Sequence, residues 1–132
     1  MFALKSELRK NTASNCTCLG HYQIFECTAV GLGATIWTGS VFQDQCPDDE
    51  LVLLHSEFEN GVRKECGPNI IAQSMNVNVT DDSFTSHLKV LVTSNFADGT
   101  VQCIYRNQTS INNIGSESVN IAGKKLGMLR WI

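Results

Sequence analysis

The sequence has little charge, almost no proline and no long apolar run. Charged residues make up 17% of the 132 residues and prolines number two, whereas hydrophobic residues reach 42%. This balance is typical of a folded domain and excludes a disordered tail or a charge-rich helical bundle. Because no run of about 20 apolar residues occurs, no transmembrane helix is expected. Residues 124–132 are too short and too charged to form one.

A basic surface is also missing. The chain has 10 Lys and Arg against 13 Asp and Glu, which gives a net charge of -3. Binding to nucleic acid depends on cationic side chains that displace counterions from phosphates. We therefore expect no nucleic-acid partner.

Sequence motifs of catalysis and of metal binding are absent. The segment 115–118 resembles a nucleophile elbow but lacks its closing glycine, and no phosphate-binding glycine loop or zinc-protease helix occurs. His21, His55 and His87 each stand alone, which favours solvated or satisfied polar roles. The acidic stretches at 48–50 and 81–82 lack the ligand spacing of a calcium loop. We expect no enzyme activity, no catalytic residue, no cofactor and no metal.

Six cysteines and three glycosylation sequons are the strongest compositional signals. An even number of cysteines in a small, loop-rich chain favours disulfides, which persist in oxidising compartments. Sequons begin at Asn15, Asn78 and Asn107, and each predicts a glycosylation site in an exported protein. Together these features predict an extracellular or cell-surface location.

The first ten residues give the one contrary signal. They contain the only helix-like pattern in the chain and no apolar segment that could act as a signal peptide. We expect that the chain is a fragment of a longer secreted or cell-surface protein. Contact with a membrane would then come through parts of the parent protein outside this chain.

Short runs of β-branched and aromatic residues predict strands throughout the rest of the chain. The clearest is 84–92, where Phe84, Leu88, Val90 and Val92 alternate with polar residues and should face a core. Further strands are expected at 22–30, 34–42, 70–79, 101–105 and 118–121, and the apolar run 50–54 reads as a strand or a helical turn. In this phase His87 should point to solvent. The pattern predicts an all-β antiparallel sandwich or barrel.

Glycine and asparagine clusters mark the expected turns. Asn60-Gly61 predicts a two-residue hairpin, because both residue types tolerate positive φ. A hairpin centred there would place Cys66 opposite His55. A short turn is expected at 31–34 and a longer polar loop at about 107–114.

The order of Cys27, Trp37 and Cys103 resembles the immunoglobulin superfamily. The resemblance covers residues 18–123 and its wide spacing is similar to variable-type domains. It implies a Greek-key β-sandwich in which a Cys27–Cys103 disulfide joins the two sheets and Trp37 packs against it. Leu88 and Val90 match an inward aliphatic pair of that family, as part of a core with Trp37 and Val101.

Two positions depart from the family pattern. Val101 stands where the family has its corner tyrosine, and the signature aspartate is shifted by one, to Asp98. The chain would therefore be a divergent member. We expect an N-terminal extension at 1–17, the immunoglobulin-like domain at 18–123 and a linker or tail at 124–132.

The remaining four cysteines leave several pairings open. Cys46 and Cys66 would close a loop of 20 residues and, if bonded, would join the two ends of the segment that holds the expected hairpin. Six cysteines allow about 15 connectivities, and Cys16 and Cys18 could pair with each other, with another domain or with a second chain. A Cys-x-Cys metal site is a further alternative, which the absence of the paired ligand spacings of structural zinc disfavours.

The resemblance implies an extracellular recognition or adhesion module, one domain of a receptor or secreted protein. Its partner would be a protein or a glycan, including a second copy of the same chain. An intracellular spacer domain of the muscle-filament kind is the alternative, and it predicts reduced cysteines and unmodified sequons. If a glycan occupies Asn107, binding is expected on a sheet face or on the cysteine-rich middle segment.

Overall fold

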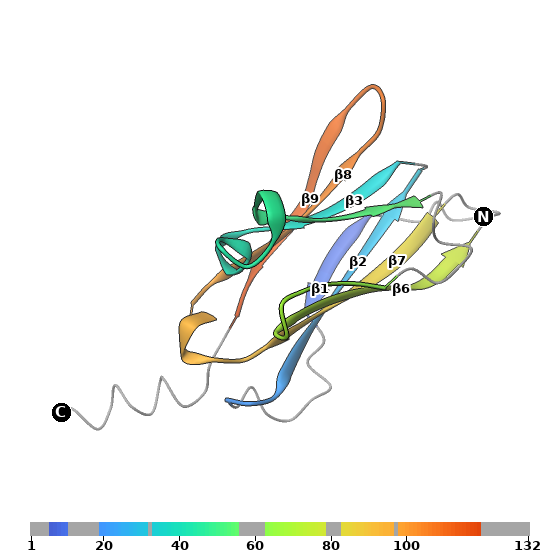
Figure 1. The fold of residues 1–132 in the computed structure, drawn as a ribbon. Coiled ribbons are helices and arrows are strands. Elements are labelled where there is room, and N and C mark those ends of the chain that lie inside the picture. Colours follow the sequence, from blue (N-terminus) through green and yellow to red (C-terminus); the bar gives the residue numbers. More distant parts are fainter. Residues whose placement is uncertain are drawn as a thin grey trace.

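The two-sheet architecture is visible in the computed structural model (Figure 1). It describes residues 6–10, 19–31, 33–55, 63–78, 83–96 and 98–119, with the backbone alone for 74–78. Short strands and 3-10 turns follow one another along these residues: β1 (Glu7–Lys10), β2 (Tyr22–Val30), β3 (Ala34–Thr38), η1 (Ser40–Phe42), η2 (Pro47–Asp49), β4 (Leu51–Leu54), β5 (Arg63–Cys66), β6 (Ile70–Asn78), β7 (Ser83–Leu91), η4 (Ser94–Phe96), β8 (Thr100–Arg106) and β9 (Ile111–Ser118).

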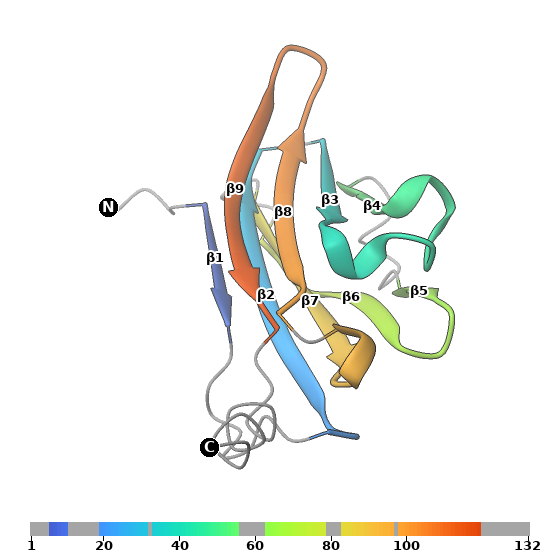
Figure 2. The same ribbon diagram turned by 90° about the vertical axis from the view of Figure 1, so that its left-hand side faces the viewer.

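One sheet has the strand order β1-β2-β7-β6-β5 and the other has the order β4-β3-β8-β9. All pairings in both sheets are antiparallel. Figure 2 looks onto the four-stranded sheet, with β2, β7 and β6 behind it. The predicted all-β antiparallel sandwich is confirmed.

Alternation along the strands builds the core between the sheets. Phe84, Leu88 and Val90 of β7 are buried, as is Val92 just after it, which confirms the predicted inward face. Val101, Cys103 and Tyr105 of β8 are buried in the same way on the facing sheet. Burial of these apolar side chains is the main favourable contribution to folding.

Trp37 and a disulfide link the sheets at the centre of this core. Cys27 of β2 and Cys103 of β8 are bonded across the sandwich, with Cα atoms 6.5 Å apart. Trp37 of β3 is fully buried, and its indole N–H donates to the Ser86 hydroxyl of β7 over 2.7 Å. The second sheet thus satisfies the one polar group of the buried indole.

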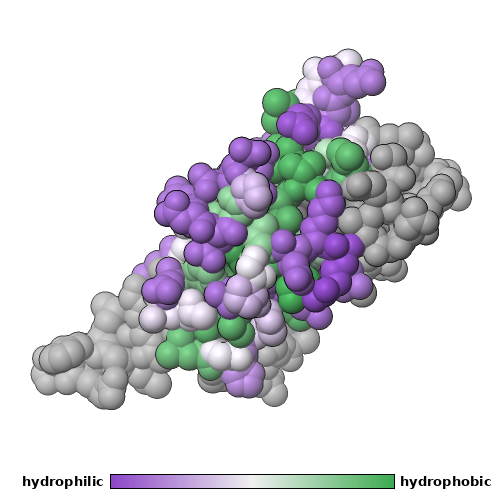
Figure 3. All heavy atoms as spheres, in the orientation of Figure 1, coloured by the Kyte–Doolittle hydropathy of each residue, from purple (hydrophilic) through white to green (hydrophobic). Residues whose placement is uncertain are grey.

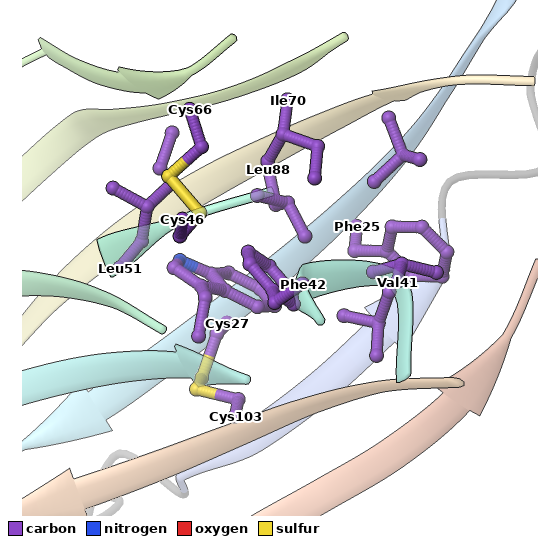
Figure 4. Packing of buried hydrophobic residues seen from close by; sticks show 14 of the residues in the cluster. Phe25, Cys27, Val41, Phe42, Cys46, Leu51, Cys66, Ile70, Leu88 and Cys103 are labelled. Atoms are coloured by element: carbon purple, nitrogen blue, oxygen red, sulfur yellow. A yellow bond between two sulfur atoms is a disulfide. The ribbon is translucent and has the colours of Figure 1, made fainter. Parts of the chain in front are cut away.

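A second disulfide joins the sheets at the edge formed by β4 and β5. Cys46 lies between η1 and η2, and Cys66 ends β5, with 5.0 Å between their Cα atoms. Beside it, the Lys64 ammonium of β5 donates to the Val52 carbonyl of β4 over 2.8 Å. Figure 4 shows Phe42 between the two disulfides. The Cys46–Cys66 disulfide and the hydrogen bond from Lys64 to Val52 together close this side of the sandwich.

Several predictions about local structure are wrong. The strand expected at 34–42 ends at Thr38, because Gly39 turns the chain with a φ of 126°. A side chain there would meet the Thr100 carbonyl oxygen at 2.2 Å. The helix-like N-terminus contains β1, which pairs with β2, so the sandwich already includes residues of the expected extension.

The hairpin expected around Asn60-Gly61 is a further error. β4 pairs with β3, whereas β5 pairs with β6 in the other sheet, so the chain crosses between sheets here. The physical reason is burial: Leu51 and Leu53 place β4 over the core, where it pairs with β3 beside Trp37 and not with the charged β5. The Asn60-Gly61 turn itself lies outside the described residues.

Removing the edge disulfide should lower the stability of the domain. The Cys46→Ala/Cys66→Ala variant frees a loop of 20 residues, and loop-closure entropy predicts a loss of about 3 kcal/mol in unfolding free energy. Urea denaturation of the wild type and the variant measures it. An unchanged midpoint would contradict the assigned role of this bond.

Candidate functional site

The outer face of the four-stranded sheet carries two cross-strand rows that are mostly apolar. Because Trp37 and Cys103 point inward, the alternate residues of β3 and β8 point outward. The register aligns the rows across all four strands: Leu54, Ala34, Arg106 and Ile111 in one, and Val52, Ile36, Ile104 and Asn113 in the next. We call the surface of these eight residues the apolar face.

Exposure on the apolar face rises from its centre to its edges. Ile36 on the central strand is only 4% exposed, because apolar side chains of β4 and β8 flank it. Leu54 is 42% exposed and Ile111 is 70% exposed, at opposite edges of the sheet. Large apolar side chains left in water at aligned positions are a feature of interaction surfaces.

Charge is distributed unevenly around the apolar face. Among the residues of β3, β4, β8 and β9, only Arg106 and Glu117 are charged, and Glu117 lies opposite the inward-facing Val101. Arg106 sits at the end of the face next to the β8–β9 hairpin. The acidic stretch 48–50 directly precedes β4 and lies at the other end. The row that exposes Leu54 and Ile111 is therefore also the positive end of the face, and the acidic stretch lies toward the other end.

The outer face of the five-stranded sheet has a different character. Arg9, Glu26 and His87 form a cross-strand row in which each Glu26 oxygen has a partner, Arg9 at 2.6 Å and His87 at 2.9 Å. The hydrogen bond from Arg9 lowers the pKa of the Glu26 carboxyl, against partial burial, which raises it. His87 thus lies on the outer face, as the strand phase predicted, and its contact with Glu26 leaves it only partly exposed there.

The β8–β9 hairpin projects beyond the sheet in both ribbon views (Figures 1 and 2). Its loop is Asn107–Ser110, shorter than the expected 107–114, because β9 begins at Ile111. The Asn107 side-chain oxygen accepts from the Thr109 and Ser110 amides, at 2.8 Å each, and from both hydroxyls. The tip is hydrophilic, and hydrophobic surface begins at its base (Figure 3).

The turn expected at 31–34 and the loop expected at about 107–114 lie at the same end of the sandwich, where Gly31 and Gly33 approach Tyr105 and Arg106. His55 lies at this end as well, which its isolated position in the sequence did not indicate. His55 follows β4 and is 8% exposed. Its Nδ1 accepts from the Gly33 amide at 3.0 Å and lies 2.8 Å from the Gly31 carbonyl oxygen. Its ring packs against Phe84 and lies beside Tyr105. Burial lowers the pKa of His55 to about 4, although the Gly31 contact raises it.

Cys27, Cys103, Cys46 and Cys66 form the two disulfides, and the predicted core set Trp37, Leu88, Val90 and Val101 is buried. The first sequon and its neighbours Asn15, Cys16 and Cys18 lie outside the described residues. Asn78 ends β6, but its sequon continues beyond the described part of the chain.

Within the described residues, no three His, Cys, Asp or Glu side chains are placed to hold a metal ion. No helix among them is long and apolar enough to cross a membrane. Comparisons with protein-family models, curated proteins and solved structures found no match for this chain.

Acid should destabilise the domain through His55. Above pH 6.5 the histidine is neutral in both states, whereas below that value the unfolded chain gains a proton that the folded chain, with its pKa of about 4, does not take up. Stability is therefore lost as the pH falls from 6.5 to 4, by up to about 3 kcal/mol.

The His55→Gln variant is the control for this pH effect. Its unfolding free energy, measured by urea denaturation at several pH values, should be lower at pH 7 but should change less between pH 6.5 and 4. The pH dependence of stability that comes from acidic residues such as Glu26 is the same in the wild type and in the variant, so the difference between the two proteins isolates His55. An identical pH dependence in the two proteins would contradict the role of His55.

Proposed function

We propose that the chain is an extracellular immunoglobulin-like recognition or adhesion module whose apolar face binds a second copy of the same chain. The aligned apolar rows on that face carry the proposal. They expose Leu54 and Ile111, whereas the outer face of the opposite sheet carries an ion-paired row of Arg9, Glu26 and His87. No catalytic role is proposed.

The immunoglobulin-like part of the proposal is supported by how the chain is connected. β2 and β7 pair in one sheet, β3 and β8 pair in the other, and the disulfide joins β2 to β8. The indole of Trp37 on β3 is buried beside that bond. This combination is the one on which the sequence resemblance depends. The Greek-key topology belongs to the same proposal.

The extracellular location is supported by the two disulfides. Cys46 and Cys66 close the outer edge of the sandwich, and Cys27 and Cys103 are fully buried between the sheets. Disulfides persist where thiols are not kept reduced. Intact mass before and after reduction separates this location from the intracellular spacer alternative, which requires free thiols in the natively produced protein.

A second copy is favoured as the partner because the apolar face has complementary ends. A two-fold axis that crosses the strands would turn one copy end over end on the other. Arg106 of each copy would then approach the acidic end of the other, and the apolar rows would cover each other. Opposite charges at the rim of an interface set orientation and rate of association more than affinity.

Removing the exposed apolar side chains should weaken self-association. The Leu54→Ser/Ile111→Ser variant is expected to raise the dissociation constant of the dimer at least about tenfold, because anchor residues of an interface contribute more than 1 kcal/mol each. Sedimentation velocity over a concentration series measures it. Tyr22→Ser is the matched control, since Tyr22 is 39% exposed on the other sheet. A wild type that stays monomeric, or equal loss in the control, contradicts the proposal.

Reversing the charge of Arg106 tests how the two copies are oriented in the proposed dimer. Arg106→Glu is expected to weaken the dimer, because it places like charges together at both ends of the interface. Combining it with Glu50→Arg should restore part of the loss. If Arg106→Glu strengthens association or the double variant is weaker still, the end-over-end arrangement is wrong.

A further inference from the structure

Asn107 is the one sequon whose three residues the structure describes completely. Its side chain is unusual because a single oxygen, Oδ1, organises the whole hairpin tip. Oδ1 accepts from the backbone amides of Thr109 and Ser110 and from their hydroxyls, at 2.8 to 3.2 Å. The turn therefore uses the amide oxygen and leaves the amide nitrogen out of its hydrogen bonds.

The amide nitrogen of Asn107 points toward the inner side of the hairpin. Nδ2 donates to the Tyr105 hydroxyl over 3.3 Å. Tyr105 is one of the inward-facing residues of β8, and its hydroxyl packs against Gly31, where a side chain would meet it at 2.6 Å. Arg106 lies between the two residues and faces the other way, because successive residues of a strand alternate.

We infer that Asn107 carries an N-linked glycan that leaves the molecule over the end of the sandwich, next to the β2–β3 turn, and keeps the apolar face free. The inference rests in part on the proposed function, since that defines the face to be kept free. The glycan would limit access to the end of the domain and leave access to the sheet.

The chemistry of attachment fits the bonds of this side chain. In the transfer, the Asn107 Nδ2 forms a bond to the anomeric carbon of a lipid-linked oligosaccharide, and the bond from that carbon to the diphosphate breaks. One Nδ2 proton passes to a base of the transferring enzyme. The second Nδ2 proton remains available to Tyr105, and no bond of the Oδ1 turn is lost. The folded hairpin thus accommodates the modified residue.

Occupancy is tested on the chain secreted from glycosylating cells behind an added signal peptide. Mass analysis of the peptide that contains Asn107, before and after enzymatic deglycosylation, should find the glycan. Thr109→Ala should abolish the modification and Thr109→Ser should keep it, because only the latter retains the hydroxyl of the sequon. An unmodified Asn107 in the secreted wild type overturns the inference.

The direction of the glycan is tested by moving it. In the Thr109→Ala background, Ile111→Asn with Asn113→Thr builds a sequon on the apolar face. Enzymatic removal of the native glycan should change the dimer dissociation constant by less than about twofold. Enzymatic removal of the relocated glycan, compared within the Ile111→Asn variant itself because that substitution also removes an anchor side chain, should lower its dissociation constant at least about tenfold. Equal inhibition by both glycans overturns the inference.

A second measurement of direction does not depend on the dimer. Removing the native glycan should shift the amide resonances of Gly31 and Gly33, beside the β2–β3 turn, and leave those of Val52 and Leu54 in place. The reverse pattern contradicts the inference. If the deglycosylated chain never self-associates, the proposed function fails, and these resonances still decide where the glycan lies.

Discussion

The bond between the Trp37 indole and the Ser86 hydroxyl, beside the Cys27–Cys103 disulfide, is the contact on which the rest of the fold depends. It joins the central strand β3 of one sheet to β7 of the other over 2.7 Å in a fully buried environment. An indole N–H buried without a partner would cost about 1–3 kcal/mol. The contact therefore specifies which faces of the two sheets meet.

The choice of the inward-facing residues also determines which side chains lie on the outer faces of the sheets. Because Trp37 and Cys103 face inward, Ile36 and Ile104 must face outward, beside Val52 on β4. A shift of one residue in register would exchange these sets. The apolar face is thus a consequence of the same constraint that forms the core, and the disulfide at the β4–β5 edge holds β4 in its place.

The edges of the sandwich are closed by a different kind of contact. Leu8 of β1 packs against Gly115 of β9, where a side chain would meet it at 3.1 Å. On the other side, Lys64 and the Cys46–Cys66 bond join β5 to β4 and its preceding loop. Exposed sheet edges invite pairing with other chains. Among the described residues, both sides of the sandwich are thus held by contacts between the sheets.

The sequence was sufficient to predict the two-sheet architecture, but it did not predict the apolar outer face of the four-stranded sheet. Period-two patterns such as 84–92 predicted the inward faces correctly, because one buried face leaves a clear alternation. The short runs 34–37 and 51–54 are apolar at almost every position, so their alternation could not separate core from surface. That continuity was the available signal of an apolar outer face.

Long-range contacts were the other part that local patterns could not supply. Asn60-Gly61 favours a hairpin locally, but the strands on either side belong to different sheets. His55 and Ser86 gain their roles from residues more than twenty positions away, such as Gly31 and Trp37. A single sequence gives no record of such partners, whereas the pairing of Cys27 with Cys103 could be expected from a family pattern.

The most direct test of the central claim is a methyl NMR dilution series of the isotopically labelled, deglycosylated chain. If the apolar face is the recognition surface, the methyl resonances of Ile104, Ile111 and Leu54 shift as the protein is diluted. Those of Ile24 and Ile71, on the outer face of the five-stranded sheet, stay where they are. Shifts confined to Ile24 and Ile71, or none at any concentration, would contradict the account.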